Sequence, residues 1–395
     1  MAPPPSEATD TPAPAWLEPA LNRALDRLEE TSQTLTDFPH VTEASEWVTY
    51  PDGVWTGGFY IGQLWLLYRI RRQEEVRRRA EQYLERYLPR RQEEQNHDLG
   101  MMFYPSAVMG WRLTGEERYR LAAIDAARAL MAQAHPTAGF IPGWGFFGGD
   151  DWVGSSLVDT LMNLPLVVWA ADQTNDDDLR QAAVKHADLS VANHLRDDGS
   201  AYHVFRFDPE SGAPLGGATY QGKAPDSRWS RGLGWAIAGL SMLGAALPNP
   251  DYLRAASRAA AFYRANVPDD LVPYWDFDVD PRRRPDASQG AALGAAPGAA
   301  QGDESRDSAA GAISCFGMLR LASATADAEL RGYALDLLRS LSESYADAAP
   351  RHALLGHATA DLPHGLGIDG ATVYGDYYYM KALVEAGRGP LPKAA

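Results

Sequence analysis

The chain has 395 residues, of which 36 are Lys or Arg and 52 are Asp or Glu, so its formal net charge is −16. Phosphate backbones favour basic protein faces, and this charge therefore argues against nucleic acid as a partner, although a local field can still attract a small anion. A hydrophobic content of 45% excludes a chain disordered throughout, and the single cysteine excludes a disulfide framework or a Cys-rich metal site.

The N-terminal residues 1–15 contain five prolines and predict a disordered arm. The start of the chain lacks the basic and apolar regions of a secretory signal. No window of ~20 residues is apolar and free of charge, as a membrane span requires. We therefore expect a cytoplasmic protein without a membrane partner.

Apolar residues at helical spacing predict twelve helices within a single domain that spans 16–395. The expected helices lie at 16–35, 55–72, 74–91, 98–113, 115–134, 156–173, 176–195, 230–246, 250–265, 306–322, 326–347 and 373–387.

These helices alternate in character along the chain. Segment 74–91 has one apolar stripe and a charged face, as a helix that covers a core has, whereas 55–72, 156–173 and 230–246 are apolar nearly all round. Six outer–inner hairpins that close on themselves form an (α/α)6 barrel, and an open solenoid is the alternative. No repeat of fixed period is present, which favours the barrel.

Two segments depart from the helical pattern. Residues Tyr202–Asp208 and Ala218–Gln221 predict a small β-hairpin inserted between two helices. The Ala/Gly-rich stretch 282–305 has no apolar periodicity and predicts a flexible surface loop. We expect its replacement by a short turn to change neither turnover nor melting temperature, because closure entropy depends weakly on loop length.

Polar and aromatic residues mark the start of each expected inner helix, and in a barrel these starts meet at one mouth. Free N–H groups and the positive ends of the helix dipoles there favour an anionic ligand. Aromatic faces suit a sugar ring. For a single Ser or Asp, an ordinary N-cap is an equally good explanation. The aromatic candidates are Trp55, Trp144, Trp152, Trp229, Trp235, Trp275 and Tyr374.

Asp159 is the most informative single residue. It precedes a run that contains Leu161 and Leu164, so its carboxylate is expected to be buried in the first turn of an apolar helix. Burial raises a carboxyl pKa, and Asp98 would raise it further if it lay nearby, which suits a general acid. The alternative is a buried cap satisfied by backbone N–H groups. Pro165 is expected to kink the helix.

A metal or a cofactor is not expected. His97, Asp98 and His203 are not spaced like the ligands of a standard zinc site. No Walker string or nucleophile elbow is present.

Several strings in chain order resemble glycoside hydrolase family 88, the unsaturated glucuronyl hydrolases. They cover almost the whole chain and together are highly specific. The strings are Trp55-Thr-Gly-Gly-Phe59, His97-Asp-Leu-Gly100, Phe103-Tyr-Pro-Ser106, Trp111-Arg-Leu-Thr-Gly115, Asp159-Thr-Leu-Met-Asn-Leu-Pro165, Arg196-Asp-Asp-Gly-Ser-Ala-Tyr-His203, Phe207-Asp-Pro-Glu-Ser-Gly212, Gln221-Gly222, Trp229-Ser-Arg-Gly232 with Trp235, Pro273-Tyr-Trp-Asp-Phe-Asp278, Arg306-Asp-Ser308 and Tyr374-Gly-Asp-Tyr-Tyr378.

The resemblance implies an (α/α)6 barrel and removal of a 4,5-unsaturated uronic acid from lyase-generated oligosaccharides by hydration of a vinyl ether. It implies that Asp159 protonates C4 and that water then attacks C5, with Asp98 as second carboxylate. Arg231 is expected to pair with the uronate carboxylate, because a guanidinium binds two oxygens at once. The other substrate-binding positions implied are Trp55, His97, Trp144, His203, Gln221, Trp235 and Tyr374.

Two departures concern substrate preference. Tyr220 stands where the family commonly has His, and residues 357–364 lack the Lys and Ser cluster of sulfate-binding members. The expected partner is a small anionic unsaturated oligosaccharide, and the expected assembly is a monomer or weak homodimer. Three alternatives remain open: an unsaturated rhamnogalacturonyl hydrolase, a sugar epimerase, and a non-catalytic carbohydrate-binding toroid.

Overall fold

The computed structural model describes residues 13–143, 153–247, 249–279 and 304–389. Trp144, Trp152, almost all of the expected loop at 282–305 and most of the expected N-terminal arm lie outside these residues.

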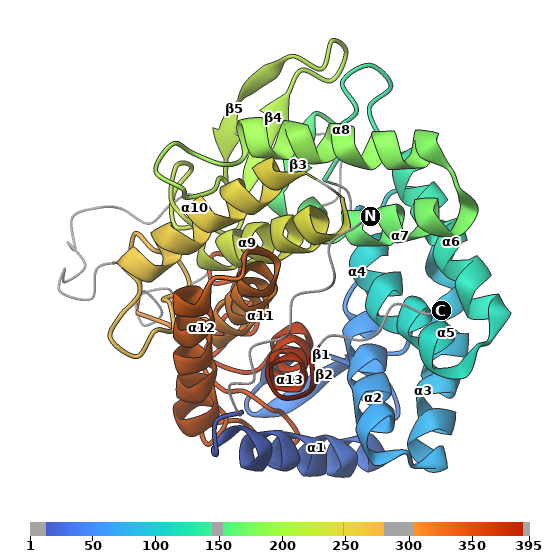
Figure 1. The fold of residues 1–395 in the computed structure, drawn as a ribbon, viewed down its shortest axis with the longest axis vertical. Helices are drawn as coiled ribbons and strands as arrows, with labels where there is room; N and C mark the ends of the chain where they lie inside the picture. The colour runs from blue at the N-terminus through green and yellow to red at the C-terminus, as the bar shows by residue number, and fades with distance from the viewer. Residues whose placement is uncertain (1–12, 144–152, 248, 280–303, 390–395) are drawn as a thin grey trace, which may run out of the picture.

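Two concentric sets of helices make up the molecule (Figure 1). The inner helices are buried on most sides, whereas the outer helices bury one face and expose the other. The inner set is α2 (Gly57–Arg71), α4 (Leu99–Phe103) with α5 (Met109–Thr114), α7 (Leu164–Thr174), α9 (Ser230–Ala246), α11 (Ser308–Thr325) and α13 (Val373–Arg388). The outer set is α1 (Leu17–Thr34), α3 (Glu74–Tyr87), α6 (Glu117–Ala132), α8 (Asp177–Asn193), α10 (Pro250–Asn266) and α12 (Ala328–Ser340).

The inner set closes into a ring, because α13 near the C-terminus packs against α2 near the N-terminus. Around the ring α2 contacts α4 and α5, and α7, α9, α11 and α13 follow in order. The predicted (α/α)6 barrel is therefore confirmed, and the open solenoid is wrong. None of the helices in the described part of the chain is both long enough and apolar enough to cross a membrane.

Most helix boundaries agree with the sequence prediction, and α9 was predicted to the residue. The expected helix 98–113 is instead α4, a π-helical turn at Tyr104–Val108, and α5. Pro105 lies in that turn and has no N–H to donate, so a regular helix cannot run through it.

The expected helix at 156–173 begins differently from the prediction. Residues Ser155–Leu157 form strand β3, and Val158–Met162 form a 3₁₀ turn that carries Asp159. Asp159 therefore precedes the α-helix. Pro165 does not kink α7, because it occupies one of the first two positions, where no N–H is required.

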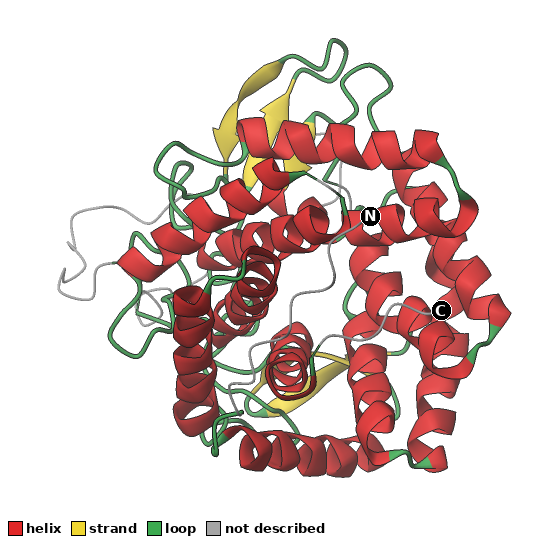
Figure 2. Cartoon of the chain, in the orientation of Figure 1, coloured by secondary structure: helices red, strands yellow, loops and turns green. Residues whose placement is uncertain are grey.

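Strands occur in two places among the helices (Figure 2). The predicted hairpin is present as β4 (Val204–Phe207) and β5 (Pro214–Ala218), and β3 pairs with β4 on its other side. The second strand lies earlier than predicted, so Gln221 follows it in a bend. The sequence analysis missed a second hairpin, β1 (Phe38–Glu43) and β2 (Glu46–Tyr50).

Candidate active site

The starts of the inner helices surround a cavity of about 290 Å³. Nine of the ten site residues predicted from the sequence line it, and the tenth, Trp144, lies outside the described residues. The nine are Trp55, His97, Asp98, Asp159, His203, Gln221, Arg231, Trp235 and Tyr374. Trp229 also lines the cavity, whereas Trp275 is buried elsewhere, so its expected place at the mouth was wrong.

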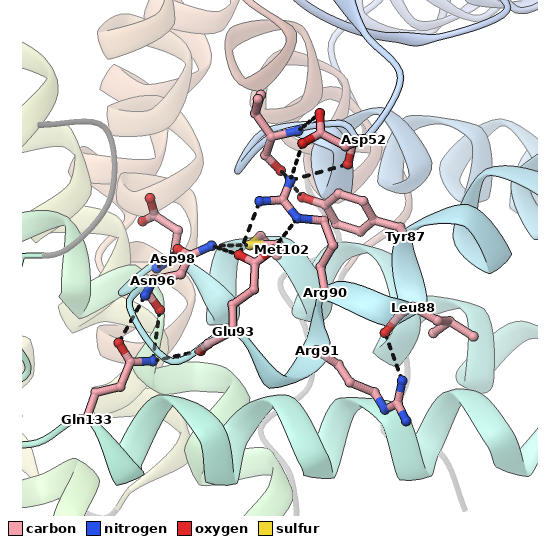
Figure 3. Close-up of polar contacts among 11 residues, drawn as sticks. Asp52, Tyr87, Leu88, Arg90, Arg91, Glu93, Asn96, Asp98, Met102 and Gln133 are labelled. Atoms are coloured by element: carbon pink, nitrogen blue, oxygen red, sulfur yellow. Dashed lines mark hydrogen bonds and ion pairs between the residues drawn. The ribbon is translucent and has the colours of Figure 1, made fainter. Parts of the chain in front are cut away.

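A hydrogen-bond network fixes the segment that carries His97 and Asp98 (Figure 3). The Asn96 side chain accepts from the Asp98 N–H at 2.9 Å and donates to Glu93 at 2.6 Å. Glu93 in turn pairs with Arg90 at 2.6 Å, and Arg90 also donates to the carbonyl of Val54, next to Trp55. The chain before α4 is therefore tied to the loop that carries Trp55. The Asp98 side chain makes no capping hydrogen bond, so its carboxylate is not explained as a helix cap.

Asp98 and Asp159 are linked through one amide side chain. Asn163 Nδ2 lies 3.5 Å from Asp98 Oδ1 and 3.5 Å from the Asp159 carbonyl oxygen, while its Oδ1 accepts from the Met101 N–H at 2.6 Å. Asn163 thus holds the 3₁₀ turn against the start of α4. The sequence analysis quoted Asn163 in a motif without assigning it this role.

The pKa of Asp159 is raised from 3.8 to about 7, first by burial and second by the negative charge of Asp98. Its Oδ2 is buried and has no hydrogen-bond partner among the described residues. Burial also raises the pKa of Asp98. A carboxyl group with these properties is protonated in a substantial fraction of molecules near neutral pH and can serve as a general acid.

His203 is held as the neutral tautomer that carries its proton on Nε2. The backbone N–H groups of Tyr220 and Gln221 donate to Nδ1 at 3.3 and 3.2 Å, so Nδ1 must be an acceptor. Burial, followed by the charge of Arg231, lowers the His203 pKa well below 6.5. Its Nε2 lies 3.7 Å from Asp159 Oδ2, and the Nε2–H can donate toward the cavity.

Three acceptors of the protein bind the guanidinium of Arg231 through its Nη groups. Its Nη1 donates to Asp307 Oδ2 at 2.5 Å and to the Thr359 carbonyl at 2.6 Å, and its Nη2 donates to the Ala360 carbonyl. A guanidinium has five N–H bonds, so Nε–H and one Nη2–H remain after these contacts. Asp307 also caps α11 by accepting from Ala310 N–H at 3.1 Å, which places Arg231 relative to two inner helices.

Aromatic rings form one wall of the cavity. Trp55 stacks on Tyr374 with ring centroids 5.4 Å apart and planes 22° from parallel, and Trp235 lies 6.2 Å from Tyr374. Trp229 contacts His203 at 4.3 Å on the other side. Flat apolar faces beside carboxylates and a guanidinium suit a sugar ring that carries a charged group.

Several lining residues were not predicted from the sequence. His40 enters the cavity from the missed strand β1, and Asp361 enters from the long connection before α13. Next to the cavity lining, His364 Nδ1 bonds Asp361 Oδ1 at 2.8 Å, and Tyr220 stacks on His364 with ring centroids 4.1 Å apart. Neither β1 nor this connection carries a sequence signal that indicates a site. No group of three or more potential metal ligands occurs among the described residues.

Comparison with known proteins agrees with this geometry. The Glycosyl Hydrolase Family 88 model matches residues 21–267. The chain is 34% identical over 363 residues to the unsaturated glucuronyl hydrolase of Bacillus sp. strain GL1, a match that covers 89% of this chain and 91% of that protein. It is 32% identical over 361 residues to the unsaturated chondroitin disaccharide hydrolase of Streptococcus pyogenes serotype M1, covering 88% and 85%.

The fold agrees with a solved structure over almost the same extent. The crystal structure of the unsaturated glucuronyl hydrolase from Bacillus sp. GL1 matches with a TM-score of 0.85 and 33% identity, covering 94% of this chain and 97% of that one. The barrel, the cavity at its mouth and the sequence matches all lead to one conclusion: the chain belongs to Glycosyl Hydrolase Family 88 and is a glycoside hydrolase.

Proposed function

We propose that this hydrolase removes a 4,5-unsaturated uronic acid from the non-reducing end of a small anionic oligosaccharide by hydrating the double bond, with Asp159 as the proton donor. The family and the relatives support hydrolysis of unsaturated glucuronyl substrates. They give no support to a sugar epimerase or to a non-catalytic toroid.

The proposed reaction starts with protonated Asp159. Its proton moves to C4 of the C4=C5 double bond, and the positive charge that forms at C5 is shared with the ring oxygen. A water molecule attacks C5 and returns a proton to the Asp159 carboxylate, so the acid is regenerated. The resulting hemiketal opens to a C5 ketone, and the rest of the oligosaccharide leaves from C1. The net change is the addition of one water molecule.

The observation that carries the proposal is the pairing of Asp159 with Asp98. Direct attack at an anomeric carbon uses two carboxyl groups that flank the glycosidic bond in separate roles. Here two buried carboxyl groups belong to residues that contact one amide, Asn163, and only the Asp159 group has its pKa raised to about 7, because burial and then the charge of neighbouring Asp98 help to keep it protonated. The neutral His203 can donate from Nε2 but cannot take the proton at Nδ1, because two backbone N–H groups occupy that atom.

The proposal is tested with unsaturated disaccharides whose conjugated double bond absorbs in the ultraviolet. We expect the wild-type protein to abolish this absorbance. We expect Asp159→Asn to fold and bind substrate but to lose at least about 10³-fold in turnover, within the range for one acid–base group. Near-normal turnover by the Asn variant would move the acid elsewhere, and Asp98 would be the next candidate.

The parent polysaccharide is best identified with a panel. The panel separates the proposed unsaturated glucuronyl hydrolase activity from the rhamnogalacturonyl alternative. It consists of unsaturated disaccharides from chondroitin, hyaluronan, heparin, gellan and pectin rhamnogalacturonan. Asp361 brings a carboxyl group to the cavity lining. We expect unsulfated members of the panel to be preferred, since an ionised Asp361 repels a sulfate group.

A further inference from the structure

A second cavity, of about 580 Å³, lies at the opposite end of the barrel from the active site. The inner helices α5, α7, α9, α11 and α13 contribute to it mostly from their middle and later residues, whereas residues near or before the helix starts line most of the active site. Its lining includes the aromatic residues Tyr104, Trp111, Trp169, Phe316 and Tyr377 and the charged residues Arg112, Asp172, Arg320, Lys381 and Glu385.

A layer of packed rings separates the two cavities. The Tyr378 ring lies 5.7 Å from Phe59, 5.6 Å from Trp235 and 5.3 Å from Phe316, measured between centroids. Along α13, Tyr374 lines the active site and Lys381 lines the second cavity, a rise of roughly 10 Å for an α-helix. The two cavities share no lining residue, so the second one is a separate compartment.

The charge of the second cavity is unusual for a protein with a net charge of −16. It is lined by three cations, Arg112, Arg320 and Lys381, and two carboxylates. One carboxylate, Asp172, is bound at 2.8 Å by Arg180, which is not a lining residue. The other, Glu385, is shared between Lys381 at 3.1 Å and Arg320 at 3.7 Å. After these ion pairs are counted, the cavity wall has a net positive charge.

The helix dipole can stabilise Arg112, which lies in the last turn of α5, but it does not account for the other two cations. Cations near a helix C-terminus are stabilised by the dipole, but the effect falls off within the last turn. Arg320 precedes the end of α11 at Thr325 by more than one turn, and Lys381 precedes the end of α13 at Arg388 by nearly two turns. Arg320 and Lys381 therefore lie too far from the ends of their helices for the helix dipole to explain them.

Arg112 is the cation with the fewest protein contacts. Its guanidinium lies 5.8 Å from the Tyr104 ring, and its Nε is buried without a hydrogen-bond partner. No carboxylate of the described residues lies within ion-pair distance of it. The Nη groups of Arg112 have no hydrogen-bond partner among the described residues and, unlike Nε, are not buried, so an anionic ligand in the cavity can accept hydrogen bonds from them.

The walls add a second requirement for the ligand. Trp111 and Trp169 meet edge to face at 5.6 Å, and Lys381 lies 5.4 Å from the Phe316 ring. Aromatic faces pack against the C–H face of a sugar ring, while Gln173 and Tyr104 offer polar groups to hydroxyls. Cations beside these faces suit a carboxylate on the same ring.

We propose that the second cavity is a binding site for a uronic acid sugar, of one or two rings, separate from the active site. Its carboxylate lies among Arg112, Arg320 and Lys381, and its ring lies against the tryptophans. This assignment depends on the wall chemistry alone and stands whether or not the proposed reaction at the other end of the barrel is correct.

The lining supplies its own reporters for a binding experiment. Met109 and Met242 line the second cavity, and none of the methionines in the described part of the chain lines the active site. With ¹³C-methyl methionine in the full-length protein, D-glucuronate should shift these two signals in a saturable way. The Met109→Leu and Met242→Leu variants assign the signals. D-glucose, benzoate and sodium chloride at equal concentration are the controls and should not reproduce the shift.

Substitutions in the wall give predictions of opposite sign. Arg112→Gln should weaken glucuronate binding about tenfold or more, as expected for loss of a charge-assisted contact. Glu385→Gln should strengthen it several-fold, because it removes the negative charge that competes with the ligand. A purely structural cavity would not respond in this direction. Trp55→Ala, at the active site, should leave the Met109 and Met242 shifts unchanged.

Three results would overturn the proposal. The first is the absence of a saturable shift with glucuronate, and the second is an equal shift with glucose, benzoate or salt. The third is loss of the shift in the Trp55→Ala variant, which would trace the signal to the active site. Hydrolysis of unsaturated disaccharides is measured separately, so failure of the catalytic proposal is distinguishable from failure of this one.

Discussion

Burial is the largest cause of the raised pKa of Asp159, and the negative charge of Asp98 is the second largest. In the Asp98→Asn variant this repulsion is lost, so the pKa of Asp159 falls and its protonated form persists only to a lower pH. We expect the alkaline limb of kcat/KM near pH 7 in the wild-type protein, from the pKa of Asp159, and at lower pH in the variant. The pH profile of kcat/KM measures this, with the exposed Asp336→Asn as control. A limb that stays in place or moves upward contradicts the coupling.

Arg231 has a more constrained position than its sequence context suggests. Removing it leaves Asp307 buried and unpaired, so Arg231→Ala should cost about 3–5 kcal/mol of stability in addition to any effect on substrate. Arg231→Lys keeps the charge but loses the planar fork. We expect it to lower kcat/KM by about 2 kcal/mol, roughly 30-fold, mainly through KM. A normal KM in a folded Lys variant would mean that other groups hold the uronate.

Residue types were predictable from the sequence, but hydrogen-bond partners were not. The family strings identified Asp98, Asp159 and Arg231 correctly as residues of one cavity. Asn163 and Asp307 stand in the quoted strings, but only the folded barrel brings Asn163 to Asp98 and brings Asp307 and Ala360 to Arg231. The Tyr220 and Gln221 amides that set the His203 tautomer are backbone groups, which carry no sequence signal at all.

The close approach of α4 to the 3₁₀ turn is an element-scale requirement for the site. A Cβ on Gly100 would lie 2.2 Å from the backbone of Asn163, so the two segments would have to separate. Gly100→Ala should therefore lower both the melting temperature and turnover, by an overpacking cost of about 1–3 kcal/mol or more. Gly332 in α12 is the matched control, because a Cβ there meets nothing within 4 Å. Gly332→Ala should stabilise by about 0.4–1 kcal/mol. Equal melting temperatures for the two variants would contradict the packing argument.

Elements with a strong helical pattern were predicted well, and irregular ones were not. Helix α9 has uniform apolar character and no proline, so both its ends were predicted correctly. The hairpin of β1 and β2 was missed because its turn uses Ala44 and Ser45 in left-handed conformation, where Asn-Gly is the usual signal. That omission also hid His40, which β1 delivers to the cavity.

At the scale of the whole molecule, ring closure explains why one end of the barrel is catalytic. The inner helix starts converge there, so residues from Trp55 to Tyr374 meet although most of the chain separates them. The alternation of apolar character predicted this closure. The second cavity was not predicted, because Arg112, Arg320 and Lys381 are single cations on three different helices and form no local motif.

The central claim is that the double bond is hydrated, with the proton delivered to C4. Turnover of an unsaturated disaccharide in heavy water tests this directly, because Asp159 exchanges its proton with solvent before each cycle. NMR of the product should show one deuterium at C4 and a ketone at C5, with the double bond gone. A released uronic acid that keeps its C4=C5 double bond, or that carries no deuterium at C4, would contradict the account.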